Sequence, residues 1–281
     1  MPFVNDYEMI DVERGYDMRN EEYKSNLRMY IGPGIKGDEP DYGHCLRRVF
    51  NYDTLSMLRI PSAPGLRSPA KPGYVLHPGQ AEIEYCLYGE RRLSYPDGKK
   101  YYLHPGSCFM HAPDQPHGME GLSVGKSGVI CFHSAKVSEV GRELWPAGKF
   151  YEAENGYKVV YCPEAPVSER SPEGTEEKEI AETYKMAFYD VVIKPGQTTP
   201  GKFWLQNNCD QIVFVISGQG LFVYPDKVYN IHEEMAVYNH AGQPYRYTNT
   251  SKDEDLHIAV CYHAEHFDDV KRTEVRVAEI G

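Results

Sequence analysis

The sequence predicts an all-β protein made of two similar barrels, and three observations support this prediction. Twenty prolines and 25 glycines interrupt the 281 residues, and few stretches show a helical period. That pattern is typical of short strands joined by turns. The chain also holds 23 tyrosines, a residue that suits half-buried strands. Finally, the second half repeats patterns of the first, and such self-similarity indicates repeated architecture.

The repeat has an offset of roughly 129 residues in three places. The matched segments are EIEYCLYGE (82–90) with QIVFVISGQ (211–219), HPGSCFMHAPDQPH (104–117) with HEEMAVYNHAGQPY (232–245), and ICFH (130–133) with VCYH (260–263). The last match places His133 opposite His263. We therefore expect two tandem barrels of the same design.

The expected elements follow in chain order. The arm contains a short helix at 21–30 and a strand at 51–60, and the connector contains a helix at 176–186. Strand patterns return at 128–135 and 186–196. The predicted divisions are an arm with the first strands at 1–68, a first barrel at 69–150, a partly helical connector at 151–185 and a second barrel at 186–281.

Composition excludes several classes of function. The net charge is −11 and no basic stripe is visible, which argues against a nucleic-acid partner. No apolar run approaches the roughly 20 residues that span a bilayer, so we expect no membrane association. The charged first residues lack the apolar core of a signal peptide. Seven cysteines without CxxC pairs predict reduced thiols in a cytoplasmic protein. Buried, inert thiols are expected at Cys86, Cys108, Cys131 and Cys261.

The stretch from Tyr74 to His117 carries the chemistry. It places His77, Glu82 and His117 in an alternating segment interrupted by turns at Gly89 and at 97–98. The second turn, Asp-Gly, is a strong hairpin signal. Two imidazoles and a carboxylate on one side of a small barrel could hold a divalent metal.

These residues also resemble the two short motifs of the cupin superfamily. The first motif is carried by Pro72-Gly73, His77, Glu82 and Gly89, and the second by Gly106, Pro113, Pro116 and His117. The matching frame in the second half is Pro195-Gly196, Gly218, Gly242 and Pro244. The chain thus resembles a bicupin. The resemblance implies two jelly-roll barrels with a metal inside a barrel, and a homodimer formed through the sheets.

The resemblance assigns the metal ligands. Cupins commonly use an HxH pair and a Glu from the first motif and a His from the second, but Val75 stands here where the first His belongs. His77, Glu82 and His117 remain. Three such ligands leave open positions and favour Fe²⁺, with Zn²⁺, Mn²⁺ or Ni²⁺ as alternatives. The other interpretation is that the two histidines only line a polar barrel mouth.

The second half changes every proposed ligand. The positions that match His77, Glu82 and His117 hold Gln206, Gln211 and Tyr245, which are poor ligands for a transition metal. We therefore expect a second barrel without a metal.

Further candidates lie nearby. Strand alternation puts Glu84 on the same face as Glu82, where it is either a general base or the ion-pair partner of Arg91 or Arg92. Gln80, Tyr85 and His111 are candidates for substrate contacts. Because His133 matches His263 in the half expected to lack a metal, a structural role is predicted for His133.

Three functions follow. The first is a metal-dependent enzyme acting on a small polar molecule in the first barrel, preferably a non-haem Fe(II) dioxygenase. The second is an isomerase or an aminohydrolase similar to ureidoglycine aminohydrolase, with Glu84 as the catalytic base. The third is a bicupin that binds a small molecule without catalysis.

Overall fold

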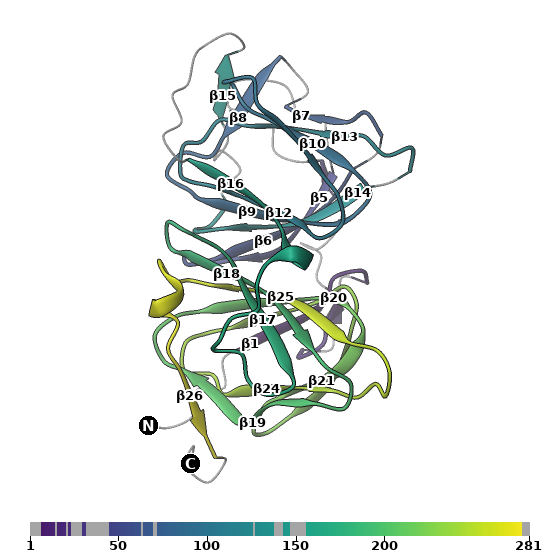
Figure 1. Cartoon of the computed structure of the whole chain (residues 1–281), viewed down its shortest axis with the longest axis vertical. Helices are drawn as coiled ribbons and strands as arrows, with labels where there is room; N and C mark the ends of the chain where they lie inside the picture. The colour runs from purple at the N-terminus through teal and green to yellow at the C-terminus, as the bar shows by residue number, and fades with distance from the viewer. Residues whose placement is uncertain are drawn as a thin grey trace. The chain divides into compact units, whose positions relative to one another are not determined.

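The structure is a computed structural model of the whole chain (Figure 1). It describes residues 7–14, 16–20, 22–23, 30–31, 45–62, 64–69, 72–125, 127–137, 143–146 and 156–276. The chain divides into two compact units. The first barrel is the unit of Asn26–Glu164 with Thr183–Lys185, and the second barrel is the unit of Met1–Ser25, Ala165–Glu182 and Met186–Gly281.

The first barrel is built mainly from two antiparallel sheets, which form opposite walls in Figure 1. The large sheet has the order β16 (Tyr157–Tyr161), β12 (Ser107–His111), β9 (Glu82–Tyr88), β14 (Ser127–His133), β6 (Ser56–Ser62), β5 (Cys45–Asn51), β4 (Tyr30–Ile31). The smaller sheet has the order β11 (Lys100–Leu103), β10 (Arg91–Ser94), β13 (Gly118–Gly121), β7 (Arg67–Ser68). A separate pair joins β15 (Glu143–Pro146) to β8 (Gly73–Leu76).

The second barrel repeats this plan. Its large sheet has the order β17 (Thr175–Thr183), β18 (Met186–Ile193), β25 (Leu256–Tyr262), β20 (Gln211–Ser217), β23 (Met235–Asn239), β1 (Tyr7–Asp11), β2 (Tyr16–Asp17), β3 (Glu22–Tyr23). Its smaller sheet has the order β22 (Val228–His232), β21 (Gln219–Val223), β24 (Tyr245–Asn249), β19 (Thr198–Gln206), β26 (Arg272–Val275).

Each barrel takes strands from outside the part of the chain that the sequence assigned to it. In the first barrel β16, from the expected connector, pairs with β12 and sets Tyr157 opposite His111. In the second barrel β1, from the N-terminal arm, pairs with β23 and sets Tyr7 opposite Asn239. Each added strand covers an edge that would otherwise leave backbone groups unpaired. The first part of the arm, through β3, therefore belongs to the second barrel, whereas β4, β5 and β6 belong to the first, and both units are discontinuous in sequence.

Both helix predictions are wrong at the residues described. Within 21–30, Glu22–Tyr23 and Tyr30 lie in strands β3 and β4, and the other residues lie outside the described part. The expected helix at 176–186 is strand β17, followed by a turn and the first residue of β18. Charged residues fill this segment, but it pairs with β18 and buries several of its residues there, and these tertiary contacts override a weak local preference.

Short 3₁₀ turns occur at Cys162–Glu164 and Phe267–Asp269. No helix in the described part of the chain is long and apolar enough to cross a membrane.

The expected turns at Gly89 and at 97–98 are present. Gly89 has a φ of 73° and Gly98 a φ of 85°, a region that glycine enters without steric cost. Gly218, the repeat mate of Gly89, has a φ of 85°, and an added Cβ there would lie 2.3 Å from the Asp255 carbonyl oxygen. The turns at Gly89 and Gly218 send β9 into β10 and β20 into β21, from one sheet of each barrel to the other, whereas the turn at 97–98 joins β10 to β11 within one sheet.

Candidate metal centre

Glu82 is the centre of the first barrel's polar cluster. It begins β9, the third strand of a seven-stranded sheet, with β12 and β14 as neighbours. The register sets it opposite His111 on one side and His133 on the other. Directly opposed residues point their side chains to the same face, so one carboxylate and two imidazoles meet there by sheet geometry alone. Glu82 is 3% exposed.

His77 and His117 reach the same carboxylate from loops at the ends of strands. His77 follows β8, and its Nε2 lies 3.6 Å from Oε2 of Glu82. His117 precedes β13, and its Nε2 lies 3.2 Å from the same oxygen. Val75, which stands where the first histidine of the motif would be, exchanges two 2.8 Å backbone hydrogen bonds with His117. Val75 therefore holds the backbone of His117 in place.

The tautomer of His117 follows from its neighbours. Nδ1 lies 3.0 Å from the carbonyl oxygen of Gln115, which can only accept a hydrogen bond, so Nδ1 carries the hydrogen. Nε2 then presents its lone pair toward Glu82. This arrangement, a ligand imidazole held by a carbonyl at its other nitrogen, is common at metal sites.

The spacing of these donors fits a divalent metal. Ligand atoms about 2.1 Å from one ion lie roughly 3.0–3.4 Å apart at octahedral or tetrahedral angles. The two measured separations, 3.2 and 3.6 Å, are close to that range. His77, Glu82 and His117 are all buried, and their ligand atoms lie within 4.8 Å of one another. Two imidazoles and one carboxylate are a donor set for Fe, Mn, Zn or Ni.

His111 lies at this cluster, but its position indicates a supporting role. Its Nδ1 lies 3.2 Å from Oε2 of Glu82, and its Nε2 lies 2.8 Å from the hydroxyl of Tyr95. Its ring stacks on that of His117, with the centroids 4.0 Å apart. Both nitrogens of His111 therefore have partners. A fixed imidazole of this kind orients the carboxylate, whereas the sequence predicted a contact with substrate.

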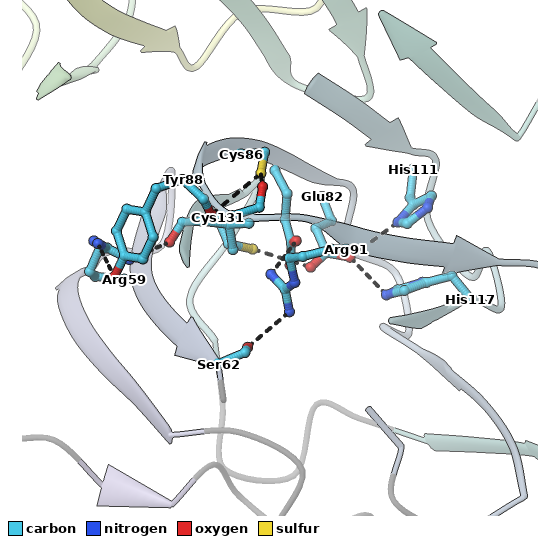
Figure 2. Close-up of polar contacts among 12 residues, drawn as sticks. Arg59, Ser62, Glu82, Cys86, Tyr88, Arg91, His111, His117 and Cys131 are labelled. Carbon is cyan, nitrogen blue, oxygen red and sulfur yellow. Dashed lines mark hydrogen bonds and ion pairs between the residues drawn. The ribbon is translucent and has the colours of Figure 1, made fainter. Parts of the chain in front are cut away.

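Two further groups reach the other side of the same carboxylate. The thiol of Cys131 donates to Oε1 of Glu82 at 3.2 Å, and Nε2 of His133 lies 4.0 Å from Oε1. Figure 2 shows Cys131 on one side of Glu82, with His111 and His117 on the other. Cys131 is buried as predicted, but it belongs to the polar cluster.

The sequence match of His133 with His263 is wrong by one residue. Glu82 pairs with His133, and its mate Gln211 pairs with Tyr262. A slip of one residue reverses which face of the sheet a side chain occupies. The repeat offset could have revealed this. It is 129 residues between Glu82 and Gln211, and the same offset matches His133 with Tyr262.

Four imidazoles set the charge of Glu82. Burial by itself would raise the pKa of this carboxyl, but His117 and His77, the hydrogen bond from His111, and His133 together hold the pKa well below its usual range. The carboxylate is therefore ionised and ready to bind a cation. Burial, Glu82 and Glu84 raise the pKa of the Cys131 thiol well above its usual value, so without a metal it is a hydrogen-bond donor.

Glu84 lies one step further along β9 on the same face. Its Oε2 is 3.5 Å from Nη1 of Arg91, and both side chains are buried. Arg91 also donates from Nη2 to the hydroxyl of Ser62 at 3.2 Å. Its Nε and Nη1 are buried without a hydrogen-bond partner among the described residues. The structure thus shows the ion pair with Arg91 that was the alternative to a free base. Arg92, the other expected partner, pairs with Glu120.

The structure does not bring Gln80 or Tyr85 to the cluster. Gln80 donates from Nε2 to the carbonyl of Lys136 at 2.8 Å. Tyr85 lies on β9 three residues after Glu82, so alternation directs it to the opposite face, where it is buried.

The second barrel has amides and hydroxyls at the corresponding positions. Gln211 donates to the hydroxyl of Tyr262 at 3.0 Å and accepts from Asn239 at 3.0 Å. Gln206 donates to the carbonyl of Cys209 at 2.7 Å. Within the described residues, the groups of His, Cys, Asp or Glu suited to a metal both contain Glu82.

A half-buried guanidinium lies beside Gln206. Arg272 on β26 is in direct register with Gln206 on β19, and it forms hydrogen bonds of 2.7 and 2.6 Å with the two carboxylate oxygens of Glu177. It also lies 4.9 Å from the ring of Trp204. The second barrel therefore has a cation of its own chain at this position, paired with the buried Glu177.

Comparison with known proteins gives a fold. No family model matches the sequence, and no curated protein matches it. Oxalate decarboxylase from Bacillus subtilis, solved at pH 4.6, is 15% identical with a TM-score of 0.60, covering 83% of this chain and 74% of its own. A structure from work on the Mn(II) centres of the same enzyme is 15% identical with a TM-score of 0.62, covering 90% and 78%.

Together with the paired sheets, these likenesses show that the chain has the jelly-roll fold. At 15% identity they show the fold and leave the chemistry to be argued from the residues of the first barrel.

Proposed function

We propose that this protein is a metal-dependent enzyme that acts on a small polar molecule inside the first barrel. His77, Glu82 and His117 would hold one divalent metal ion. The observation that carries the proposal is the convergence of two Nε2 atoms on one buried, ionised carboxylate at ligand spacing. The same positions of the second barrel hold residues that do not suit a metal.

The finer proposal is a non-haem Fe(II) dioxygenase. Two histidines and one carboxylate leave coordination positions open, and bound Fe(II) would supply the site at which dioxygen and substrate meet. The chain's own residues do the rest. His111 and His133 hold the Glu82 carboxylate in place, and Gln115 fixes the His117 tautomer. Burial of His77, Glu82 and His117 shields the site from bulk water.

Arg91 supports a substrate that carries negative charge. Its Nε is a buried donor without a hydrogen-bond partner in the part of the chain that is described, and its Nη1 has only the 3.5 Å ion pair with Glu84. Leaving such donors unsatisfied is costly, and a charged or strongly polar acceptor on the substrate would remove that cost.

Proton-transfer chemistry is the second candidate, favoured by the position of Glu84 on the same face of β9 as Glu82. Glu84 is ion-paired with Arg91 in this structure, and it would act as a base once substrate replaces it at Arg91. A buried carboxylate beside a guanidinium could accept a proton from substrate at a carboxylate oxygen. With Mn²⁺ or Zn²⁺ in the same triad, this would give an isomerase, an aminohydrolase or a lyase. The likeness to an oxalate decarboxylase with Mn(II) centres supports this version. Association as a homodimer in the cytoplasm remains a prediction.

The test is metal analysis of untagged protein, with His117→Ala as the site variant and Tyr245→Ala, at its repeat mate, as the matched control. We expect the wild type and Tyr245→Ala to bind at least about one equivalent of a divalent metal. His117→Ala should bind about one equivalent less than the wild type. Bound Fe with substrate-dependent oxygen uptake would support the dioxygenase, and bound Mn or Zn the proton-transfer version.

If wild type and His117→Ala bind equally little metal, and no added metal raises the melting temperature, the proposed function is wrong. A small-molecule-binding bicupin without catalysis would then be the better interpretation.

A further inference from the structure

The two carboxylate oxygens of Glu82 face different sets of side chains. Oε2 faces the Nε2 atoms of His77 and His117, which are the proposed ligands. Oε1 faces Cys131 at 3.2 Å and His133 at 4.0 Å. The two groups share Glu82 and use different oxygens of it. Figure 2 shows one member of each group, His117 and Cys131, on opposite sides of Glu82.

The group on the Oε1 side is itself a set of metal donors. Sγ of Cys131 lies 3.2 Å from Nε2 of His133, and all three ligand atoms lie within 4.8 Å of one another. Tetrahedral Zn²⁺ binds thiolate sulfur at about 2.3 Å and imidazole nitrogen at about 2.0 Å. Those bond lengths place the sulfur and the nitrogen roughly 3.5 Å apart, a few tenths of an ångström from the observed separation.

Sheet register explains why this second group is well fixed. Cys131 and His133 alternate along β14, so both side chains point to the same face. His133 is opposite Glu82, and Cys131 is opposite Glu84, the next inward residue of β9. All three donors therefore stand on two adjacent, fully paired central strands. A site built on strands is more precisely held than one built on loops.

The second barrel has lost this group together with the first. The positions of Glu82, Cys131 and His133 hold Gln211, Val260 and Tyr262. If Cys131 only filled space, its replacement by Val260 would have no reason to accompany the replacement of the proposed ligands. By contrast, Tyr95 keeps an equivalent in Tyr224, which donates to Asn239 as Tyr95 contacts His111. The two barrels therefore share this buried tyrosine and its hydrogen bond, but only the first barrel has the metal-donor residues.

We propose that the first barrel holds two metal ions bridged by Glu82, one bound by His77, His117 and Oε2, and a second bound by Cys131, His133 and Oε1. The inference rests on the proposed function, because the first position is the metal of that proposal. The mixed sulfur, nitrogen and oxygen donors suit a borderline cation such as Zn²⁺ or Co²⁺. Ions that share a carboxylate in two-metal enzymes lie about 3.5–4 Å apart and activate substrate together.

The test is titration of the metal-free protein with Co²⁺, followed by absorbance and by elemental analysis after removal of unbound metal. We expect two equivalents in the wild type, with a thiolate-to-cobalt charge-transfer band in the near ultraviolet. Cys131→Ser should lose that band and one equivalent, and it should keep the other. His133→Gln should also lose one equivalent. Cys86→Ser removes another buried thiol from the inward face of β9, so it serves as the control and should match the wild type.

One bound equivalent in folded wild type, with or without the band, would overturn the two-metal inference and leave the proposed function standing. In that case Cys131 and His133 act only by orienting the carboxylate, or Cys131 binds the single ion. No bound Co²⁺ in the wild type and no change in His117→Ala would instead overturn the proposed function. Melting temperatures of the variants confirm that each is folded.

Discussion

The two barrels share a frame and differ in what the frame encloses. In the first, Tyr157 stacks on Tyr95 with the ring centroids 3.7 Å apart, and Tyr95 contacts His111, which contacts Glu82. In the second, Tyr7 stacks on Tyr224 at the same 3.7 Å, and Tyr224 contacts Asn239, which contacts Gln211. The path of hydrogen bonds is therefore the same in both.

The difference lies in the charge at the end of that path. An ionised carboxylate surrounded by imidazoles binds cations, whereas an amide surrounded by tyrosines is already satisfied. The second barrel instead contains Arg272, a cation that cannot leave. Sheet geometry fixes where side chains meet, and residue type decides whether the meeting point binds a metal. Three predictions test this comparison.

Glu82→Gln gives the first barrel the amide of the second, and we expect the largest effect here. The metal affinity of the first position should fall by more than about 100-fold. Loss of a residue that only hydrogen-bonds a metal ligand lowers affinity by about 10- to 100-fold, and loss of a ligand itself should cost more. Metal-dependent activity should disappear with it. The reciprocal change Gln211→Glu should gain no metal, since Gln206 and Tyr245 are poor ligands. Isothermal titration with Mn²⁺ and Zn²⁺ measures both, and metal binding by Gln211→Glu would break the comparison.

Arg272→Met removes this cation of the second barrel. Glu177 would be left as a buried charge without its partner, which costs about 3–5 kcal/mol of unfolding free energy. Urea unfolding followed by tryptophan fluorescence, to which Trp204 beside Arg272 contributes along with Trp145, measures the loss. The double variant with Glu177→Leu should recover much of it, because no lone charge remains. The metal content of the first barrel should not change; a fall there would mean that the barrels are not independent.

A smaller effect is expected at high pH. Burial raises the pKa of the Cys86 thiol to about 11, with Arg91 opposing and Glu84 adding to the shift. Because the folded pKa lies above the unfolded value, this thiol's stabilising contribution is complete below about pH 8.5 and is lost as the pH rises toward 11. At pH 9.5 the loss should be about 1 kcal/mol.

Cys86→Ala should remove this part of the pH dependence from the first barrel, and unfolding curves at several pH values measure it. Burial likewise raises the pKa of Cys209 in the second barrel, to about 12, so the barrels should weaken together at high pH. An unchanged pH dependence in Cys86→Ala would contradict the assignment.

Much of the fold could be predicted from the sequence, but the exact pairing could not. Alternation and turn residues located β9, β14 and the turn at Gly89, because these signals are local. The segment at 176–186 misled because charged residues are compatible with a helix, and only its packing on β18 makes it a strand. The alignment of His133 with His263 failed because letter similarity cannot detect a slip of one residue, whereas strand register can.

By itself the sequence determined the two barrels, the triad His77, Glu82 and His117, and the changes at their mates, because periodicity and repeat spacing are written along the chain. The tertiary structure alone decided which distant strands complete each barrel, and that Cys131 and His133 join Glu82. These depend on which strands become neighbours, and the chain can pair strands far apart in sequence whenever doing so covers an edge and fills a core.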